Sequence, residues 1–230
     1  MTVSEMHSAV RLGLDKTSSF EYASFLTEEL DFWLNEAQER FIKQRLYGNN
    51  YKQEKYDQSQ KRIDDLKSII IQGTSIALSD SSLGINIKEA SLPIDSPTVP
   101  YMFYLNSSVE DNLGNDLQTG DIIPIELLSK YTKDFINNPY IRRPLVYLYN
   151  NKIAIIHGDE FIPDRCSILY IKKPRKLVGI GSLGTYETYI CELPEHTHRE
   201  IVAMCVEMLI ENIESPRVQT YSQINASKSE

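Results

Sequence analysis

The residues best suited to chemistry lie at the predicted start of the last helix. Glu195, His196, His198 and Glu200 place two imidazoles and two carboxylates, all common zinc ligands, within six positions. His196 and Glu200, four residues apart, would share one face of a helix, whereas the two histidines would point to different faces. Two ligands do not complete a site, and no HExxH motif is present. We expect a polar cluster at a helix start without a metal; a metal-dependent hydrolase is the alternative interpretation.

A glycine pattern, GIGSLG at 179–184, has the spacing of a dinucleotide-binding loop. Such a loop requires a strand before it and a helix after it, because the helix N-terminus binds the pyrophosphate. Here the strand-like sequence TYETYI follows, and no βαβ pattern precedes. We therefore interpret the pattern as a loop or hairpin tip and expect no nucleotide cofactor.

No serine or cysteine lies in a nucleophile motif such as GxSxG. Cys166, Cys191 and Cys205 form an odd set without a CxxC pair, which indicates a reducing compartment and no structural zinc. Cys205 falls within an apolar stretch, as a small core residue would. Acidic pairs such as Asp64 and Asp65 lie in polar stretches typical of solvated faces. The sequence thus predicts a protein that is not an enzyme and holds neither cofactor nor metal.

The strongest positive cluster is the run KKPRK, which contains Lys172, Lys173, Arg175 and Lys176. These side chains could contact DNA phosphates or an acidic partner, and a solvated strand end is the other interpretation. The net charge of −8 argues against tight or wrapping contact with nucleic acid, which needs clustered cations. An acidic surface would instead let DNA pass without sticking.

Three helices are predicted before residue 73. Thr2 and Glu5 fit a capping box for a helix that ends near Asp15. A second helix of about 20 residues begins near Thr27, with acidic residues at its start and basic residues at its end. A third is expected over about 53–71 and stops at a glycine.

The middle of the chain has the pattern of β structure. Alternating or β-branched runs lie at 85–92, 101–109, 145–149, 153–157 and 167–172. The pair Asn150-Asn151 between two of these runs predicts a two-residue hairpin turn. A short helix is expected near 125–137.

The last predicted helix is apolar almost all the way round, so other helices or a neighbouring copy of the chain must enclose it. The 14 tyrosines also suit half-buried positions at interfaces. Apolar residues of this helix and of the second helix are candidates for a subunit contact. They are Trp33, Phe41, Ile201, Cys205, Met208 and Leu209.

These elements predict an α+β fold. Helices from 1–73 and the helix at 193–215 would form an antiparallel helical bundle, with 74–192 as an inserted β-rich domain and 216–230 as a flexible tail. No apolar run approaches the roughly 18 residues that span a bilayer, and the N-terminus lacks a secretory signal pattern. We therefore expect no membrane partner.

Two segments carry a resemblance to a known family. EELDFWLNEAQERFIKQR at 28–45 and REIVAMCVEMLIENIESPR at 199–217 resemble the head-to-tail adaptor proteins of short-tailed phages, above all the ring (connector) proteins of crAss-like phages. The resemblance implies a virion structural protein that assembles as a closed ring, expected to hold twelve subunits. This ring would sit at the head–tail junction, below the portal protein and next to a tail or ring protein, after assembly in the host cytoplasm. It would form part of the channel for DNA ejection, without sequence-specific DNA contact.

Proteins of this family dock on the portal through an extended C-terminal segment, which the resemblance places here at Pro216 to Glu230. The docking candidates are then Pro216, Arg217, Val218, Tyr221 and Ile224. The small adaptors of long-tailed phages are all helical, so the β-rich region could serve either tail-side contact or outer decoration. The alternative function is an intracellular binding or regulatory module that contacts DNA or an acidic partner through Lys172–Lys176.

Overall fold

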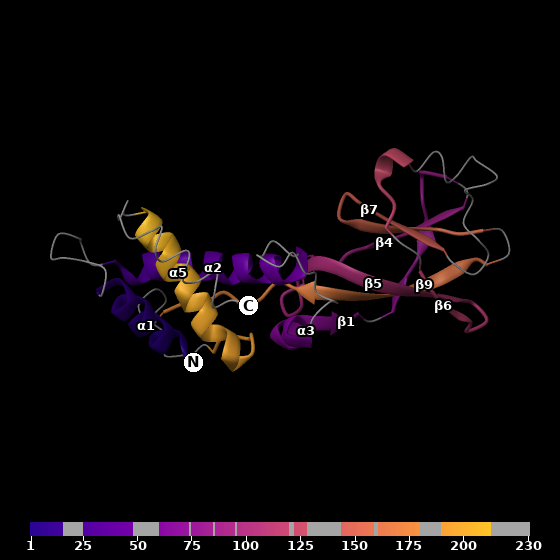
Figure 1. The fold of residues 1–230 in the computed structure, drawn as a ribbon. Helices are drawn as coiled ribbons and strands as arrows, with labels where there is room; N and C mark the ends of the chain where they lie inside the picture. The colour runs from indigo at the N-terminus through magenta and orange to yellow at the C-terminus, as the bar shows by residue number, and fades with distance from the viewer. Residues whose placement is uncertain are drawn as a thin grey trace. The chain divides into compact units, whose positions relative to one another are not determined.

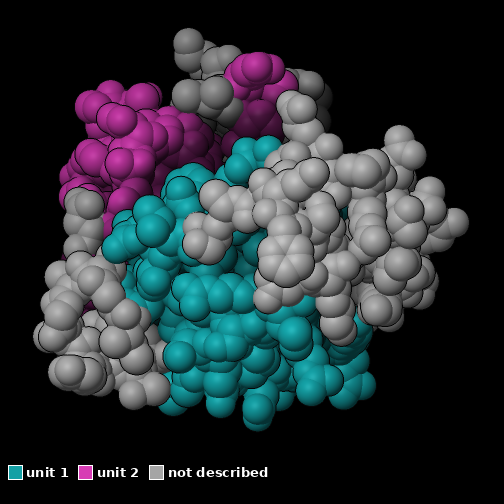
Figure 2. All heavy atoms as spheres, turned by 90° about the vertical axis from the view of Figure 1, so that its left-hand side faces the viewer, with its two compact units in different colours: residues 1–69, 174–230 teal, residues 70–173 magenta. Residues whose placement is uncertain are grey.

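A computed structural model describes residues 1–15, 25–47, 60–73, 75–84, 86–94, 96–119, 122–127, 144–158, 161–179 and 190–212. The chain divides into two compact units (Figure 2). Unit 1 comprises residues 1–69 and 174–230, and unit 2 comprises residues 70–173. Unit 1 is therefore built from two stretches of chain that are far apart in the sequence.

Helix α1 (Val3–Asp15) begins at the predicted capping box. The Thr2 N–H donates to Glu5 Oε2 at 2.9 Å, and the Glu5 N–H donates to Thr2 Oγ1 at 3.3 Å. The helix packs against α5, and Gly13 permits this close approach because a Cβ there would lie 2.8 Å from Val206 Cγ2.

Helix α2 (Thr27–Tyr47) carries Glu28 and Glu29 in its first turn and Arg45 in its last, which favours the helix dipole at both ends. Its apolar stripe is buried and packs on α5. The stripe consists of Leu30, Leu34, Ala37 and Phe41.

The third helix is shorter than expected. Helix α3 spans Gln60–Leu66, the 3₁₀ turn η2 follows at Lys67–Ile69, and strand β1 then covers Ile70–Gln72. The prediction of helix up to residue 71 is wrong, because β-branched Ile70 and Ile71 pair with strand β9. The remainder of the prediction, 53–59, lies outside the described residues.

The closing helix is covered by its own chain. The 3₁₀ turn η4 (Glu195–Thr197) leads into helix α5 (His198–Asn212), which packs on both α1 and α2. Its buried residues are His198, Ile201, Val202, Cys205, Val206, Met208, Leu209 and Ile210. No neighbouring copy is needed to enclose these side chains.

The fold is mixed α+β, but the expected antiparallel helical bundle with an inserted β-rich domain is wrong. α5 crosses α2 instead of running beside it (Figure 1). A four-helix bundle needs helices of comparable length around one core, and α3 makes only about two turns.

Unit 2 consists of antiparallel sheets. One sheet has the order β1-β9-β5-β6, built from β5 (Tyr101–Asp111), β6 (Asp116–Gln118) and β9 (Pro163–Lys172), and β2 (Ile76–Ala77) also pairs with β9. The second sheet has the order β3-β4-β8-β7. Its strands are β3 (Ser79–Asp80), β4 (Ile87–Ser91), β8 (Lys152–Ile156) and β7 (Leu145–Tyr149).

The predicted hairpin between β7 and β8 is confirmed. Asn150 has φ 45° and Asn151 has φ 63°, as the primed turns of two-residue hairpins require. Buried residues of both sheets, among them Val109, Ile153 and Ile168, form one core cluster. Of the helix predicted near 125–137, the structure describes a 3₁₀ turn, η3 (Ile125–Leu127); residues 128–137 lie outside the described part.

Candidate functional site

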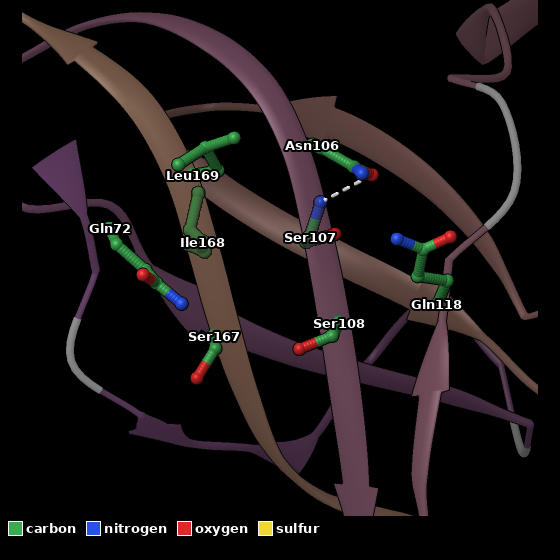
Figure 3. Close-up of a pocket in the computed structure, with 8 residues that line it drawn as sticks. All are labelled: Gln72, Asn106, Ser107, Ser108, Gln118, Ser167, Ile168 and Leu169. Atoms are coloured by element: carbon green, nitrogen blue, oxygen red, sulfur yellow. Dashed lines mark hydrogen bonds between the residues drawn. The ribbon is translucent and has the colours of Figure 1, made fainter. Parts of the chain in front are cut away.

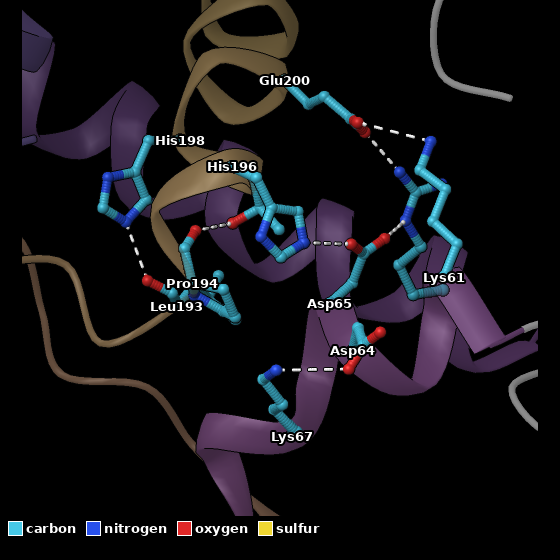
Figure 4. Close-up of polar contacts among 11 residues, drawn as sticks. Lys61, Asp64, Asp65, Lys67, Leu193, Pro194, His196, His198 and Glu200 are labelled. Carbon is cyan, nitrogen blue, oxygen red and sulfur yellow. Dashed lines mark hydrogen bonds and ion pairs between the residues drawn. The ribbon is translucent and has the colours of Figure 1, made fainter.

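A cluster of charged side chains lies inside unit 1, where α2, α3 and η4 meet (Figure 4). Arg45 of α2 and Asp65 of α3 are 3% and 0% exposed, and Arg45 Nε lies 2.8 Å from Asp65 Oδ2. The other carboxylate oxygen, Oδ1, lies 2.8 Å from His196 Nε2. Charges this deeply buried are tolerated only when they are paired.

The cluster continues onto α5. Arg45 also donates through Nη2 to Glu200 Oε2, and Lys61 Nζ lies 3.6 Å from Glu200 Oε1. The Arg45 guanidinium stacks 4.7 Å above the centre of the Phe41 ring. We call Arg45, Lys61, Asp65, His196 and Glu200 the ionic cluster; it fastens α2, α3 and α5 to one another.

This geometry bears on the predicted histidine cluster. His196 and Glu200 do belong to one group of contacts, but Asp65 and Arg45 lie between them and occupy both side chains. In the described part of the chain, no three His, Cys, Asp or Glu side chains are grouped so that they could hold a metal ion. The contacts of the ionic cluster join α2 to α3, α3 to η4 and α2 to α5, and so hold these elements together.

His198 points away from His196, as their spacing predicts (Figure 4). Its Nε2 lies 2.8 Å from the Leu193 carbonyl oxygen and its Nδ1 lies 2.9 Å from the Met1 nitrogen. Nε2–H must therefore donate to the carbonyl, which leaves Nδ1 as an acceptor. Burial, as the largest cause, lowers the pKa of His198, so the neutral imidazole is favoured here.

In unit 1, Asp31 and Asn35 of α2 form hydrogen bonds with residues 177–179, a segment that ends at the first glycine of the GIGSLG pattern. Both carboxylate oxygens of Asp31 lie 2.9 Å from the Gly179 nitrogen, and Oδ1 lies 2.8 Å from His7 Nε2. Asn35 accepts from the Leu177 N–H and donates to the Leu177 carbonyl, each at 2.8 Å. The segment 177–179 is thus fixed along α2 by side chains four residues apart.

Gly179 is required here for packing. A Cβ at this position would lie 2.5 Å from His7 Cε1 and 2.6 Å from Thr27 Cγ2. Its N–H donates to a carboxylate, whereas a dinucleotide loop would use such a group for phosphate. Gly181 and Gly184 lie outside the described residues. The first glycine of the pattern therefore serves the fold of unit 1.

In unit 2, a shallow pocket of about 180 Å³ lies on the sheet that contains β5 and β9 (Figure 3). Its lining residues are all uncharged: Gln72, Asn106, Ser107, Ser108, Gln118, Ser167, Ile168 and Leu169. Ser107 Oγ lies 2.8 Å from both Tyr104 OH and Thr119 Oγ1. The pocket can offer hydrogen bonds, but it contains no acid, base or charged group for catalysis.

A polar cluster that the sequence did not indicate lies on the other sheet of unit 2. Glu89 of β4 accepts from Lys152 at 2.6 Å, from Tyr149, and from Ser81 at 3.0 Å. These hydrogen bonds, with that from Lys152 the largest cause, lower the pKa of Glu89 to about 2. A carboxyl group this acidic remains ionised near neutral pH and is a poor general acid. The alternation of side chains along β4 and β8 indicates two strands, but it does not reveal which residues of the two strands lie opposite each other.

The cysteines are free and buried. Burial raises the pKa of Cys166 and of Cys205 to about 12 and also raises that of Cys191. Since the thiolate is the nucleophile, these side chains are chemically inert in the folded chain.

The predicted subunit-contact residues have different environments. Trp33 is half-buried on α2, whereas five others lie in the core of unit 1, where their own chain covers them. Those five are Phe41, Ile201, Cys205, Met208 and Leu209. The portal-docking candidates from Pro216 onward lie outside the described residues.

The basic run is divided between the two units. Lys172 ends β9 and Lys173 follows it in unit 2, whereas Arg175 and Lys176 belong to unit 1. Arg175 Nε lies 3.6 Å from Glu192 Oε1, and its backbone N–H donates to Glu192 Oε2 at 3.1 Å. The structure therefore does not define a single basic surface from all four side chains.

No protein-family model matches the chain, and no curated protein is similar enough to match it. Across the described ranges, none of the helices combines the length and apolar character needed to cross a bilayer.

Proposed function

We propose that this chain is a structural protein of a phage virion, a head-to-tail adaptor that assembles as a ring between portal and tail. One observation carries the proposal. Of the two segments that resemble adaptor proteins, 28–45 lies within α2, and the described part of the other, 199–212, lies within α5; these helices pack on each other in unit 1. The Arg45–Glu200 ion pair joins them directly.

The polar clusters support an assembly role over a catalytic one. The ionic cluster and the Asp31–Asn35 contacts bind elements of the same chain to one another. A subunit of a ring must keep its shape while neighbours bind it, and paired buried charges help to specify one arrangement of helices.

The surface of unit 1 also suits protein contact. Phe32 on α2 is 63% exposed. Its ring contacts the Trp33 ring edge to face, with the two ring centres 5.4 Å apart. Aromatic side chains are enriched at protein interfaces. The net charge of −8 is consistent with a channel through which DNA slides. The number of copies, the portal contact and the DNA channel remain part of the proposal.

The test is reconstitution with the portal protein encoded by the same genome. Negative-stain images of portal particles, alone and mixed with the purified chain, should differ by an added layer of density on one end of the portal. Portal particles unchanged by an excess of the chain would contradict the proposal.

A further inference from the structure

We infer that the N-terminal part of α2 binds a second copy of this chain, at the Arg175–Lys176 pair of that copy. The inference rests on the proposed self-assembly and identifies two surfaces for it. The first surface, here called the α2 face, consists of Leu26, Glu28, Phe32, Trp33 and Glu36.

The α2 face combines exposed apolar side chains on one part of the helix. Leu26 and Phe32 are each 63% exposed, and Trp33 is half-buried against Phe32. Leu26 directly precedes α2, and its carbonyl accepts from the Leu30 N–H of the first turn. Phe32 and Trp33 follow in the next turn, and their rings contact each other. Single exposed apolar residues are ordinary, but two aromatic rings in contact, with an exposed leucine directly before the same helix, offer apolar surface that an interface would cover.

Carboxylates flank this patch. Glu28 and Glu36 are exposed, and within the described residues neither forms an ion pair. The partner that fits is therefore cationic as well as able to cover aromatic rings. Arginine meets both conditions, because its planar guanidinium stacks on an aromatic face and its N–H groups pair with carboxylates.

The Arg175–Lys176 pair offers that chemistry on a rigid backbone. The Arg175 side chain is 72% exposed, and among the described residues its ion pair is with Glu192, at a long 3.6 Å. Lys176 is exposed, and the next residue, Leu177, is fixed to Asn35 by two hydrogen bonds. A cation held on an ordered segment loses little conformational freedom when it binds.

Among the described residues, no hydrogen bond or ion pair joins Arg175 or Lys176 to Glu28 or Glu36. Asp31 and Asn35 hold the segment that carries Arg175 on α2. Glu36 lies one residue beyond Asn35, about 100° further round the helix, whereas Glu28 lies on the same side as Asn35. Both surfaces belong to unit 1, so a second copy can present either one to the other.

Two charge-reversed variants test the pairing. One is Glu28→Lys with Glu36→Lys, and the other is Arg175→Glu with Lys176→Glu. All four side chains are exposed, so circular dichroism should show that both variants keep the fold. Their melting temperatures should fall only slightly, because Glu28 favours the dipole of α2 and Arg175 pairs with Glu192 at the surface. Sedimentation velocity at low salt should show concentration-dependent association of the unmodified chain, which each variant alone weakens at least tenfold. An equimolar mixture of the two variants should restore it, because the reversed charges are again complementary.

Matched apolar variants test the aromatic contribution. Phe32→Ala should weaken association at least tenfold, whereas Leu113→Ala, at an 86% exposed leucine of unit 2, should not change it. Association that neither charge reversal nor Phe32→Ala weakens, or a mixture that fails to restore it, would overturn the inference and leave the adaptor proposal intact. A chain that stays monomeric at all concentrations and adds no density to portal particles would instead contradict the adaptor proposal itself.

Discussion

Arg45 Nε and Asp65 Oδ2 lie 2.8 Å apart, with both side chains almost completely removed from solvent. The pair joins α2 to α3, and through His196 and Glu200 the same two residues reach η4 and α5. Removal of one member of a buried pair leaves the other charge without its partner, which typically costs about 3–5 kcal/mol.

Asp65→Ala should therefore lower the free energy of unfolding by about 3 kcal/mol, the lower end of that range, because Glu200 still pairs with Arg45. Urea denaturation followed by circular dichroism measures the change. The matched control is Asp64→Ala, whose carboxylate is half-exposed and pairs with Lys67 at 3.2 Å; it should cost about 0–1 kcal/mol. Equal losses for both variants would show that the buried pair does not stabilise unit 1.

Gly179→Ala should destabilise the chain by about 1–3 kcal/mol, because the new methyl group would overlap His7 and Thr27. Thermal or urea denaturation measures the effect. Gly84→Ala is the control, since its Cβ would meet the flexible Ile87 Cδ1 at 3.2 Å. If the two alanine variants were equally stable, the packing assigned to Gly179 would be incorrect.

The Glu89 contacts predict a stability that depends on pH. The folded-state pKa of Glu89, about 2, lies below the ordinary glutamate value of 4.5. Its contribution is therefore fully present above about pH 4.5 and is lost as the pH falls toward 2. Glu89→Gln should be less stable than the unmodified chain at pH 7, and the difference should shrink through that window. Glu110→Gln, at an exposed glutamate, is the control; a Glu89→Gln difference independent of pH would contradict the prediction.

The thiols should not react in the folded state. With a pKa of about 12, Cys166 and Cys205 are ionised at pH 8 in only about one molecule in ten thousand, and they are also buried. A thiol reagent such as DTNB should label the native chain slowly, at a rate set by unfolding, and should label all three cysteines at once in guanidinium. Rapid labelling of the native chain would show that at least one thiol is accessible.

Local signals in the sequence predicted several elements correctly. The capping box at Thr2 and Glu5 starts α1, and Asn150-Asn151 adopts the left-handed backbone that a two-residue turn needs. These features depend on residues within a few positions of one another. The helix forecast failed at Ile70 and Ile71 because their partners, on β9, lie about 100 positions away in the chain.

The candidate site was predictable only in part. The four-residue spacing of His196 and Glu200 correctly indicated that the two side chains face the same group of contacts. Nothing in the sequence indicated that Arg45 and Asp65 would lie between them. Asp65 looked like a solvated acid, and it is instead completely buried. The bundle prediction failed for a related reason, since helix patterns give amphipathic faces but not the angle at which two helices cross.

The division of unit 1 between both ends of the chain has a consequence for synthesis on the ribosome. The apolar faces of α1 and α2 are synthesised early, whereas α5, which packs on both helices, is translated only after all of unit 2. During that interval Leu30, Leu34 and Phe41 have no permanent cover, and nascent chains with exposed apolar surface are prone to aggregate. Chaperone binding to stalled or truncated chains that stop before residue 198 should therefore be strong, and it should be released when the last helix docks.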